Sequence, residues 1–395
     1  MTVWKYLISL GCVCFQLAAY AKESSVAARM ELRSFPSVFQ AWNPAENLNR
    51  GAEATITPLS KTESTAQTQA RHDLIFTGWN SLGLKTLEKF HGLATRFEPE
   101  SIQVALQQRR SLLSLNPDLV LLAEIRYRDA AESYLPSDSP WWKKDAQGNR
   151  VLGWKEGRHY RLNYGDPGFQ DQIAQQCRAV LKTGVFDGCM FDWWSSEDPD
   201  KIALIKKVRA AIGEDAILLV NTNGKTPNES ASYINGAFME GFGAKFFSDW
   251  KTAASSLVWA QSHFHRPVIT ALEGWTTTDR NAYAQMRSLT ALSLTHSNGY
   301  VLFADPNTLL TPDHLHDWYP FWDKSLGRPK GAIKDEPNRD GSFQRNFDHG
   351  TAVFNPPSNH PVRIQFLETR RSAATGKLSR THHLDSGDGD LFLKK

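Results

Sequence analysis

The sequence predicts an α/β chain: a (β/α)8, or TIM, barrel followed by a small C-terminal antiparallel β domain. Two observations lead to this prediction. Eight short, nearly continuous apolar runs alternate with helix-like segments between Ser37 and Asp305, a pattern typical of parallel strands covered on both faces. After Asp335 the chain changes to strand-like runs separated by Pro, Gly and Asn, which favours a small antiparallel unit.

The eight apolar runs are the expected barrel strands. Each is too short for a helix of ordinary length and is followed by polar or turn-forming residues. In chain order the runs are residues 37–42, 73–79, 118–125, 188–192, 216–221, 236–240, 267–273 and 299–305.

Segments with helical periodicity lie between these runs. Residues 99–116 are expected to form a helix that ends before Pro117, and residues 167–183 one that ends at Gly184. Residues 200–212 repeat the pattern before Gly213. A doubly wound open sheet is the alternative fold, but no Gly-rich dinucleotide fingerprint follows the first strand run.

The N-terminus has the features of an export signal. One lysine, Lys5, precedes a mostly apolar stretch over residues 6–19, and Ala19 and Ala21 supply the small residues that a signal peptidase reads. The predicted division is a signal peptide at 1–21, a barrel at 22–335 and a β domain at 336–395. We therefore expect an extracellular or periplasmic protein without a stable membrane anchor, since the apolar stretch is short of a membrane span. A buried N-terminal helix and a lipoprotein anchor at Cys12 are the alternatives.

Composition narrows the possible partners. The chain has 395 residues, 41% hydrophobic and 22% charged, with a formal net charge of +3. These values are typical of a globular protein, and such a small charge without cationic clusters argues against nucleic acid as a partner. Of the cysteines beyond the signal, Cys177 falls in a helical pattern and Cys189 in a strand pattern, so we expect two small buried residues and no disulfide.

In a barrel the functional residues follow the C-terminal ends of the strands. The residues at these positions are acids, amides and aromatic rings, which is the mixture that carbohydrate chemistry needs. Two carboxyl groups can cleave a glycosidic bond, and tryptophan can stack on a sugar ring. The candidate catalytic residues are Asp192, Glu240 and Glu273. The candidate substrate-binding residues are Trp79, Asn80, Arg126, Tyr127, Trp193, Trp194, Asn221, Asn223, Trp275 and Asp305.

No cofactor or metal is expected for this chemistry, since protons and carboxylates supply it. The sequence has no serine nucleophile elbow, no His pair at metal spacing and no phosphate-binding loop.

Several strand-end residues also have purely structural interpretations. Asp187 is interpreted mainly as the turn residue that begins the fourth strand, and Asp305 as a possible helix cap. Glu124 is a possible ion-pair partner of Arg126 or Arg128, and His314 is interpreted as structural or exposed. Because neighbours on an extended chain point to opposite sides, one of Trp193 and Trp194 is expected to pack against the barrel.

Three stretches resemble hypothetical glycosyl hydrolase-like TIM-barrel families. They are the fourth-strand pattern Gly184-Val185-Phe186-Asp187-Gly188-Cys189-Met190-Phe191-Asp192-Trp193-Trp194, then Val220-Asn221-Thr222-Asn223, then Phe238-Met239-Glu240-Gly241-Phe242. A fourth, Arg345-Asn346-Phe347-Asp348-His349-Gly350-Thr351-Ala352-Val353-Phe354-Asn355-Pro356, is similar to the start of the β domain that ends such chains.

This resemblance covers roughly residues 35–395 and implies a glycoside hydrolase. It implies Asp192 as the nucleophile and Glu240 as the acid/base. Glu273 departs from a two-acid pattern, because other barrel glycosidases carry their nucleophile on the seventh strand, so the roles of the three acids stay open.

Two rival functions are left open. One is a non-catalytic carbohydrate-binding protein on a degenerate barrel. The other is a metal-dependent deacetylase or esterase, which needs a clustered acid/His site that the sequence does not reveal. The sugar, its linkage, endo or exo action, the stereochemical outcome and the oligomeric state are not determined by the sequence.

Overall fold

The structure is a computed structural model that describes residues 25–42, 56–57, 63–243, 249–276, 280–305, 314 and 316–395. The predicted signal peptide at 1–21, with Cys12, lies outside the described residues. Within the described ranges no helix is both long enough and apolar enough to cross a membrane.

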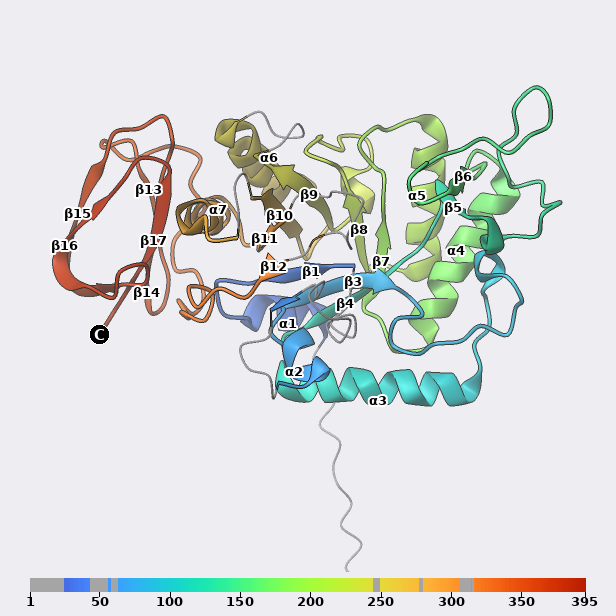
Figure 1. Ribbon diagram of the computed structural model, residues 1–395, viewed down its shortest axis with the longest axis horizontal. Coiled ribbons are helices and arrows are strands. Elements are labelled where there is room, and N and C mark those ends of the chain that lie inside the picture. The colour runs from blue at the N-terminus through green and yellow to red at the C-terminus, as the bar shows by residue number, and fades with distance from the viewer. Residues whose placement is uncertain are drawn as a thin grey trace, which may run out of the picture.

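Eight parallel strands form a nearly closed barrel, as predicted (Figure 1). Their order is the chain order, and a parallel bridge between Val38 and Val301 joins the first strand region to the last. The strands are β1 (Phe39–Ala41), β3 (Leu74–Gly78), β4 (Val120–Glu124), β7 (Gly188–Phe191), β8 (Ile217–Asn221), β9 (Gly236–Phe242), β10 (Ile269–Trp275) and β11 (Tyr300–Ala304).

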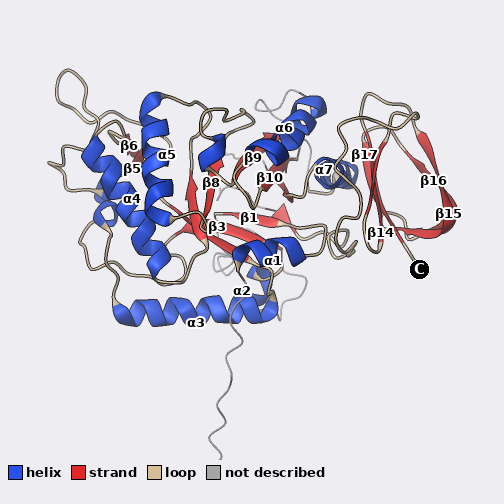
Figure 2. Ribbon diagram, turned by 180° about the vertical axis from the view of Figure 1, so that it is seen from behind, coloured by secondary structure: helices blue, strands red, loops and turns tan. Residues whose placement is uncertain are grey.

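Helices cover the outside of this barrel (Figure 2). They are α2 (Thr65–Gln69), α3 (Pro99–Leu115), α4 (Pro167–Lys182), α5 (Pro199–Ile212), α6 (Trp250–His263) and α7 (Tyr283–His296). Asp166, Asp198 and Asp249 each accept a backbone N–H at the start of a helix, which fixes where α4, α5 and α6 begin. Between β8 and β9 the chain makes only a short 3₁₀ turn, η4 (Ala231–Tyr233), so the helix–strand alternation is incomplete there.

A salt-bridge cluster ties the N-terminal ends of the strands to two helices. Helix α1 (Val26–Leu32) contributes Arg29, which pairs with Asp187, and α3 contributes Arg109, whose Nη2 lies 2.8 Å from Asp187 Oδ1. The other carboxylate oxygen accepts the backbone N–H of Leu121 at 2.9 Å. Asp187 was interpreted mainly as a turn residue. Its side chain is instead a buried anchor for α1, α3 and β4, because three donors from distant segments converge on it.

Glycine begins two strands because the neighbouring backbone is too close for a side chain. A Cβ on Gly188 would lie 2.1 Å from the carbonyl oxygen of Ile217, and one on Gly236 would lie 1.9 Å from that of Ile269. The Asp-Gly pair that begins β7 therefore combines an ion-pair anchor with a close strand contact.

The C-terminal strands form a separate five-stranded antiparallel sheet, in the order β13-β14-β17-β15-β16. They are β13 (Phe343–Asn346), β14 (Gly350–Asn355), β15 (Val362–Ser372), β16 (Leu378–Leu384) and β17 (Asp388–Leu393). All five lie in the segment predicted as the β domain. Smaller elements are β2 (Ile56–Thr57) paired with β12 (His316–Asp317), β5 (Asp129–Ala131) paired with β6 (His159–Arg161), η2 (His91–Leu93) and η3 (Glu132–Tyr134).

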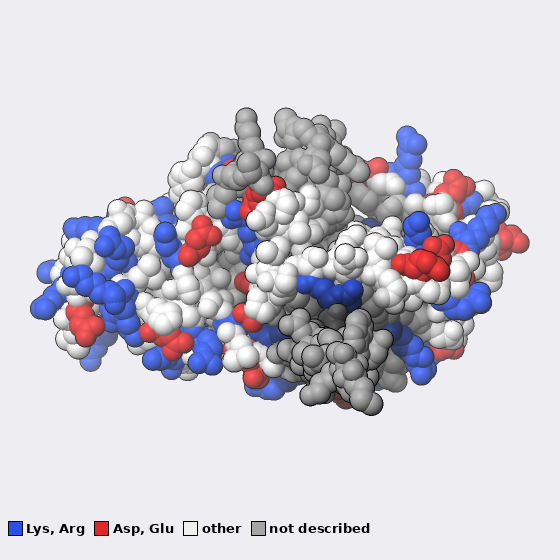
Figure 3. Space-filling view, turned by 90° about the horizontal axis from the view of Figure 1, so that it is seen from below, with Lys and Arg blue, Asp and Glu red and all other residues white. Residues whose placement is uncertain are grey.

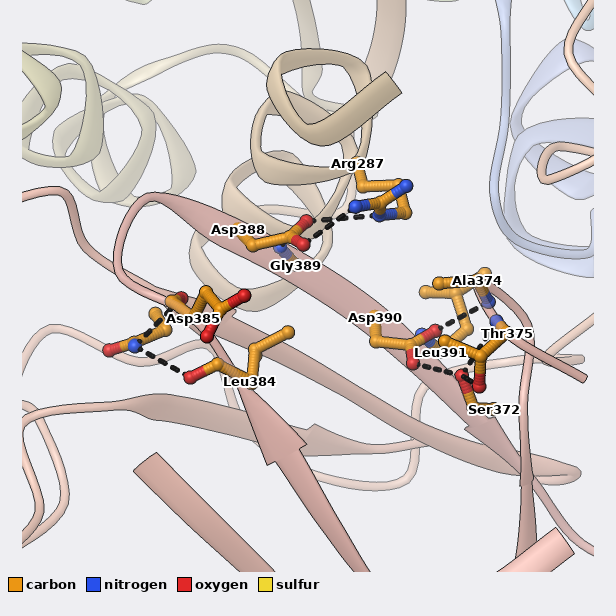
Figure 4. Close-up of polar contacts among 11 residues, drawn as sticks. Arg287, Ser372, Ala374, Thr375, Leu384, Asp385, Asp388, Gly389, Asp390 and Leu391 are labelled. Carbon is orange, nitrogen blue, oxygen red and sulfur yellow. Dashed lines mark hydrogen bonds and ion pairs between the residues drawn. The ribbon is translucent and has the colours of Figure 1, made fainter. Parts of the chain in front are cut away.

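Helix α7 is the contact between the barrel and this sheet. Figure 4 shows Arg287 of α7 pointing toward Asp388 of β17, with Nη2 and Oδ2 2.6 Å apart. Buried Arg345 of β13 donates to the carbonyl oxygens of Leu294 and Ser297 at the end of α7, at 3.0 and 2.6 Å. The arginine of the Arg345–Pro356 pattern thus satisfies helix-end carbonyls that burial would otherwise leave without donors.

The last features of the fold are a group of basic side chains on the surface and two cysteines in the core. Viewed from below, Lys and Arg side chains gather at the end of the molecule formed by the C-terminal sheet (Figure 3), where Arg363, Arg371 and Arg380 are exposed. Cys177 and Cys189 are buried free thiols, as predicted.

Candidate active site

The three candidate acids come from one side of the barrel rim, at β7, β9 and β10. Asp192 follows β7, Glu240 lies in β9 and Glu273 in β10. Side-chain exposure decreases along this series: Asp192 is partly buried, Glu240 is 9% exposed and Glu273 is fully buried. The structure therefore brings together the residues that the sequence proposed as catalytic.

Asn221, at the end of β8, lies between two of these acids. Its Nδ2 donates to Asp192 Oδ1 and to Glu240 Oε2, each at 2.9 Å. The amide orientation is set by the other end of the group, where Oδ1 accepts the backbone N–H of Asn223 at 3.1 Å. Since both carboxylate oxygens lie 2.9 Å from one nitrogen, they are no farther apart than twice that distance.

Glu273 is held by two donors from different segments. Nδ1 of buried His314 lies 2.6 Å from Glu273 Oε1, and the indole Nε1 of Trp275 donates to Oε2 at 2.9 Å. The His314 ring stacks on Trp42, with centroids 5.1 Å apart. Sequence spacing could not reveal His314 as a site residue, because it lies 41 positions from its carboxylate partner. Of the two interpretations of His314, structural or exposed, the structure supports the structural one, because His314 is 2% exposed and contacts a rim acid.

Burial and like charge raise the pKa of Glu240 to about 7. Desolvation is the largest cause, and the nearby carboxylates of Glu273 and Asp192 add to it. His314 and the Asn221 hydrogen bond act in the opposite direction. A carboxyl group with this pKa keeps its proton over much of the neutral range, which is what a general acid requires.

Asp192 has a different set of neighbours. Burial raises its pKa, but Arg126, the Asn221 amide and the backbone N–H of Trp193 favour the ionised form. The Trp193 N–H donates to Oδ1 at 2.8 Å. Two donors therefore converge on one oxygen of Asp192.

Glu124 is a further acid at the rim, beside Asp192. It is 6% exposed, and its Oε1 lies 3.1 Å from Arg126 Nε. The ion pair with Arg126 was one of the structural interpretations of this residue, and the structure confirms it. Glu124, Arg126 and Asp192 also line one small cavity of about 10 Å³, the size of a single water probe.

Three of the aromatic residues proposed to bind substrate are core residues. Trp194 is 1% exposed and its Nε1 donates to Ser230 Oγ at 3.0 Å; Tyr127 is 1% and Trp79 5% exposed. A ring buried to this extent has no free face for a sugar, so the substrate-binding role is not carried forward for these three. The expectation that one of the paired tryptophans packs against the barrel is met by Trp194.

Trp193, Asn80 and Asp305, also proposed to bind substrate, lie closer to solvent, whereas Asn221 is 2% exposed. Trp193 is partly buried, and the Cζ atom of Arg128 lies over its ring, 4.1 Å from the ring centroid. The Trp193 backbone is left-handed, with φ 60°. Asn80 is exposed, and Asp305 forms an ion pair with Arg280 at 2.8 Å. Trp193 and Asn80 stay candidate substrate contacts, whereas Asp305 is engaged in a rim salt bridge.

A metal-capable group does occur in the described part of the chain. Glu240, Glu273 and His314 each offer one ligand atom, all within 4.8 Å of one another. The sequence did not reveal this cluster. Both Glu273 oxygens accept a hydrogen bond from the protein in this structure, and one of the donors, His314, belongs to the same group.

Fold and rim define the class of the protein: a glycoside hydrolase-type (β/α)8 barrel with a C-terminal β domain. Residues 200–351 match the model of the family described as "Hypothetical glycosyl hydrolase family 15". The matched segment contains Asn221, Glu240, Glu273 and His314. No curated protein matches the sequence. The family match and the barrel together support a glycoside hydrolase, the enzyme class that the resemblance implied.

Solved structures give the same fold at low identity. A noncanonic maltogenic alpha-amylase from Thermotoga neapolitana is similar with a TM-score of 0.54 and 10% identity, over 91% of this chain and 99% of that one. An alpha-amylase from Lactobacillus plantarum has a TM-score of 0.53 and 11% identity, over 94% of this chain and all of that one. An alpha-amylase from Geobacillus thermoleovorans complexed with acarbose has a TM-score of 0.53 and 11% identity, over 93% and 99%. At this identity the similarity concerns the fold.

Proposed function

We propose that the protein is a retaining glycoside hydrolase of a poly- or oligosaccharide, with Asp192 as nucleophile and Glu240 as general acid/base. The observation that carries this proposal is the shared amide of Asn221, 2.9 Å from both carboxylates. The nearest oxygens of the two carboxyl groups are therefore no farther apart than twice that distance, which favours the roughly 5–5.5 Å spacing of retaining pairs over the roughly 6.5–9.5 Å of inverting pairs.

The proposed assignment of roles follows from the different surroundings of the two acids. Glu240, with a pKa of about 7, is protonated when substrate binds near neutral pH. Burial raises the pKa of Asp192 as well, but Arg126, the Asn221 amide and the Trp193 N–H oppose this shift by stabilising its anion. Two carboxyl groups whose environments separate their protonation states can supply one acid and one nucleophile.

In the first step an Asp192 oxygen bonds to the anomeric carbon while the glycosidic C–O bond breaks. The leaving oxygen takes the Glu240 proton, and the sugar becomes an ester of Asp192. In the second step Glu240, now a carboxylate, removes a proton from water as the water oxygen attacks the anomeric carbon, and the bond between that carbon and the Asp192 oxygen breaks. Free sugar leaves, and both carboxyl groups return to their starting states.

Glu273 and His314 are positioning residues in this scheme. The Glu273 charge raises the pKa of Glu240 and His314 opposes it, so the pair adjusts the pH at which Glu240 holds its proton. Trp275 fixes the Glu273 carboxylate through its indole N–H.

We also propose that the chain is exported and cleaved after Ala21, on the basis of its N-terminal pattern. Expression of the full chain followed by N-terminal sequencing of the exported product tests this. A secreted product beginning at Lys22 supports it, and retention of the uncleaved chain in the cell contradicts it.

Hydrolysis is tested by reducing-sugar release from a panel of polysaccharides and oligosaccharides. Alpha-glucans belong in this panel because the fold neighbours include alpha-amylases. Asp192→Asn and Glu240→Gln are expected to lower turnover at least a thousandfold while the fold is kept. Asp138→Asn, at an exposed carboxylate, is the matched control and should retain wild-type turnover.

Stereochemistry is read by proton NMR of the first anomer released. A product with the configuration of the substrate supports the retaining assignment, whereas the opposite anomer refutes it. If the wild type binds a glycan that it never cleaves, the degenerate-barrel alternative replaces the proposal.

A further inference from the structure

A second cavity lies outside the barrel, between α6, the end of α7 and the C-terminal sheet. Its volume is about 680 Å³, within the range of small-molecule sites. Residues from α6 (Trp250, Trp259), from α7 (His296) and from the C-terminal segment (Asp335, Phe343, Asn359) line it. None of the rim acids takes part, so this cavity is separate from the candidate active site. Figure 1 shows α6 and α7 next to the C-terminal sheet.

His296 gives this cavity an unsatisfied acceptor. The side chain is 1% exposed, and Nδ1 lies 3.1 Å from the carbonyl oxygen of Leu292. Nδ1 also lies 2.9 Å from Thr295 Oγ1, whose hydroxyl donates to the carbonyl oxygen of Ala291 at 2.7 Å. Since the Leu292 carbonyl and the Thr295 oxygen are then both acceptors, we assign the ring proton to Nδ1 and a lone pair to Nε2. Nε2 is buried without a hydrogen-bond partner. Burial also lowers the pKa of His296 to about 4, so at neutral pH the ring stays neutral and needs a donor from outside the protein.

The rest of the wall suits a ligand with both hydroxyl groups and apolar faces. Trp250 and Trp259 are partly buried, and Trp259 stacks on His263 with ring centroids 4.3 Å apart, a contact that fixes its orientation. The rings of Phe343 and His296 pack against each other, with centroids 4.6 Å apart. Asp335 and Asn359 bring a carboxylate and an amide to the same cavity. Aromatic faces beside polar groups are the elements that recognise a sugar, whose ring is apolar on its faces and polar at its edge.

We propose that this cavity is a second, non-catalytic carbohydrate-binding site, in which a sugar hydroxyl donates to Nε2 of His296 and a sugar ring stacks on Trp259. The choice of ligand class rests on the proposed function, but the cavity and its unpaired acceptor do not. The site joins barrel and sheet, so a chain of sugars held here is retained on the enzyme between cleavage events.

Isothermal titration of the inactive Asp192→Asn protein tests the proposal. The probes are maltoheptaose, cellohexaose, xylohexaose and chitohexaose. Ser255 is exposed on α6 and lines the cavity, so Ser255→Trp fills it without touching the rim. Ser111 is exposed on α3 and is not among the lining residues, so Ser111→Trp is the matched control.

For at least one probe, D192N is expected to bind two equivalents, D192N/S255W one, and D192N/S111W two. Trp259→Ala in the D192N background should weaken the second site at least tenfold, which gives an independent readout if the bulky substitution impairs folding. The inference is overturned if D192N/S255W binds as many equivalents as D192N. This includes the outcome in which neither protein binds any of the probes.

If D192N binds only one equivalent of a probe, the effect of S255W shows which of the two proposed sites binds it. If S255W abolishes that binding, the second site stands and sugar binding at the rim fails. If S255W leaves it unchanged, the second site is refuted and the proposed function is unaffected.

Discussion

The charge of Glu273 is predicted to set the alkaline limit of catalysis. Removing it with Glu273→Gln should lower the pKa of Glu240, because the Glu273 carboxylate is one of the groups that raise it to about 7. Glu240 then loses its catalytic proton at lower pH. The alkaline limb of the pH profile of kcat/KM is expected to move toward acid.

The size of this shift can be worked from the geometry. Ligand atoms of the two carboxylates lie within 4.8 Å, and Coulomb's law with an effective dielectric constant of about 20 gives roughly 3 kcal/mol at that separation. The His314 ring, 2.6 Å from Glu273, offsets part of this charge. We therefore expect a net shift of about one pH unit, equivalent to about 1.4 kcal/mol.

The assay is kcat/KM against pH on a substrate found in the panel above. His314→Asn removes the group that lowers the pKa of Glu240, so it should move the same limb toward alkali. Glu31→Gln, at an exposed carboxylate of α1, is the control and should leave the profile unchanged. An alkaline limb that stays in place in E273Q, or that moves the same way in both variants, refutes the role given to this pair.

Four further outcomes follow from the same contacts. Asn221→Leu removes the donor shared by Asp192 and Glu240 and should lower kcat about a hundredfold; unchanged kcat in a folded variant contradicts the bridging role. Glu240→Gln should stabilise the protein at pH 8 but not at pH 4 in urea titrations. The folded-state pKa of Glu240 is raised from 4.5 to about 7. The Glu240 carboxyl group therefore makes its full contribution to the free energy of unfolding below pH 4.5. This contribution, at most about 3 kcal/mol, is lost as the pH rises through about 7. Equal effects at both pH values would falsify this. Trp194→Ala should cost about 3–5 kcal/mol of unfolding free energy because the ring is 1% exposed; a KM effect without loss of stability would return Trp194 to the site. Dialysis against EDTA should leave activity intact, since protons and carboxylates supply the proposed chemistry; inhibition reversed by a divalent cation would identify Glu240, Glu273 and His314 as a metal site.

Asn221 is the side chain that links the two proposed catalytic acids. Asn221 has the two amide hydrogens that its neighbours require, and the Asn223 N–H keeps the amide from turning over. An aspartate at the same position would place a third negative charge between Asp192 and Glu240.

The sequence by itself determined the fold class and the strand ends. The eight apolar runs and the intervening helices are local patterns, and each reflects burial on a repeating structural unit, so the barrel, the C-terminal sheet and Asp192, Glu240 and Glu273 at the rim could be predicted. Only the tertiary structure decided the contacts between distant segments. His314 reaches Glu273 across 41 positions, Asp187 anchors α1 and α3, and Trp194 turns into the core while Trp193 stays near solvent. No local pattern encodes these pairings, because closing the barrel and packing the rim set which side chains meet, and burial then sets the pKa of Glu240.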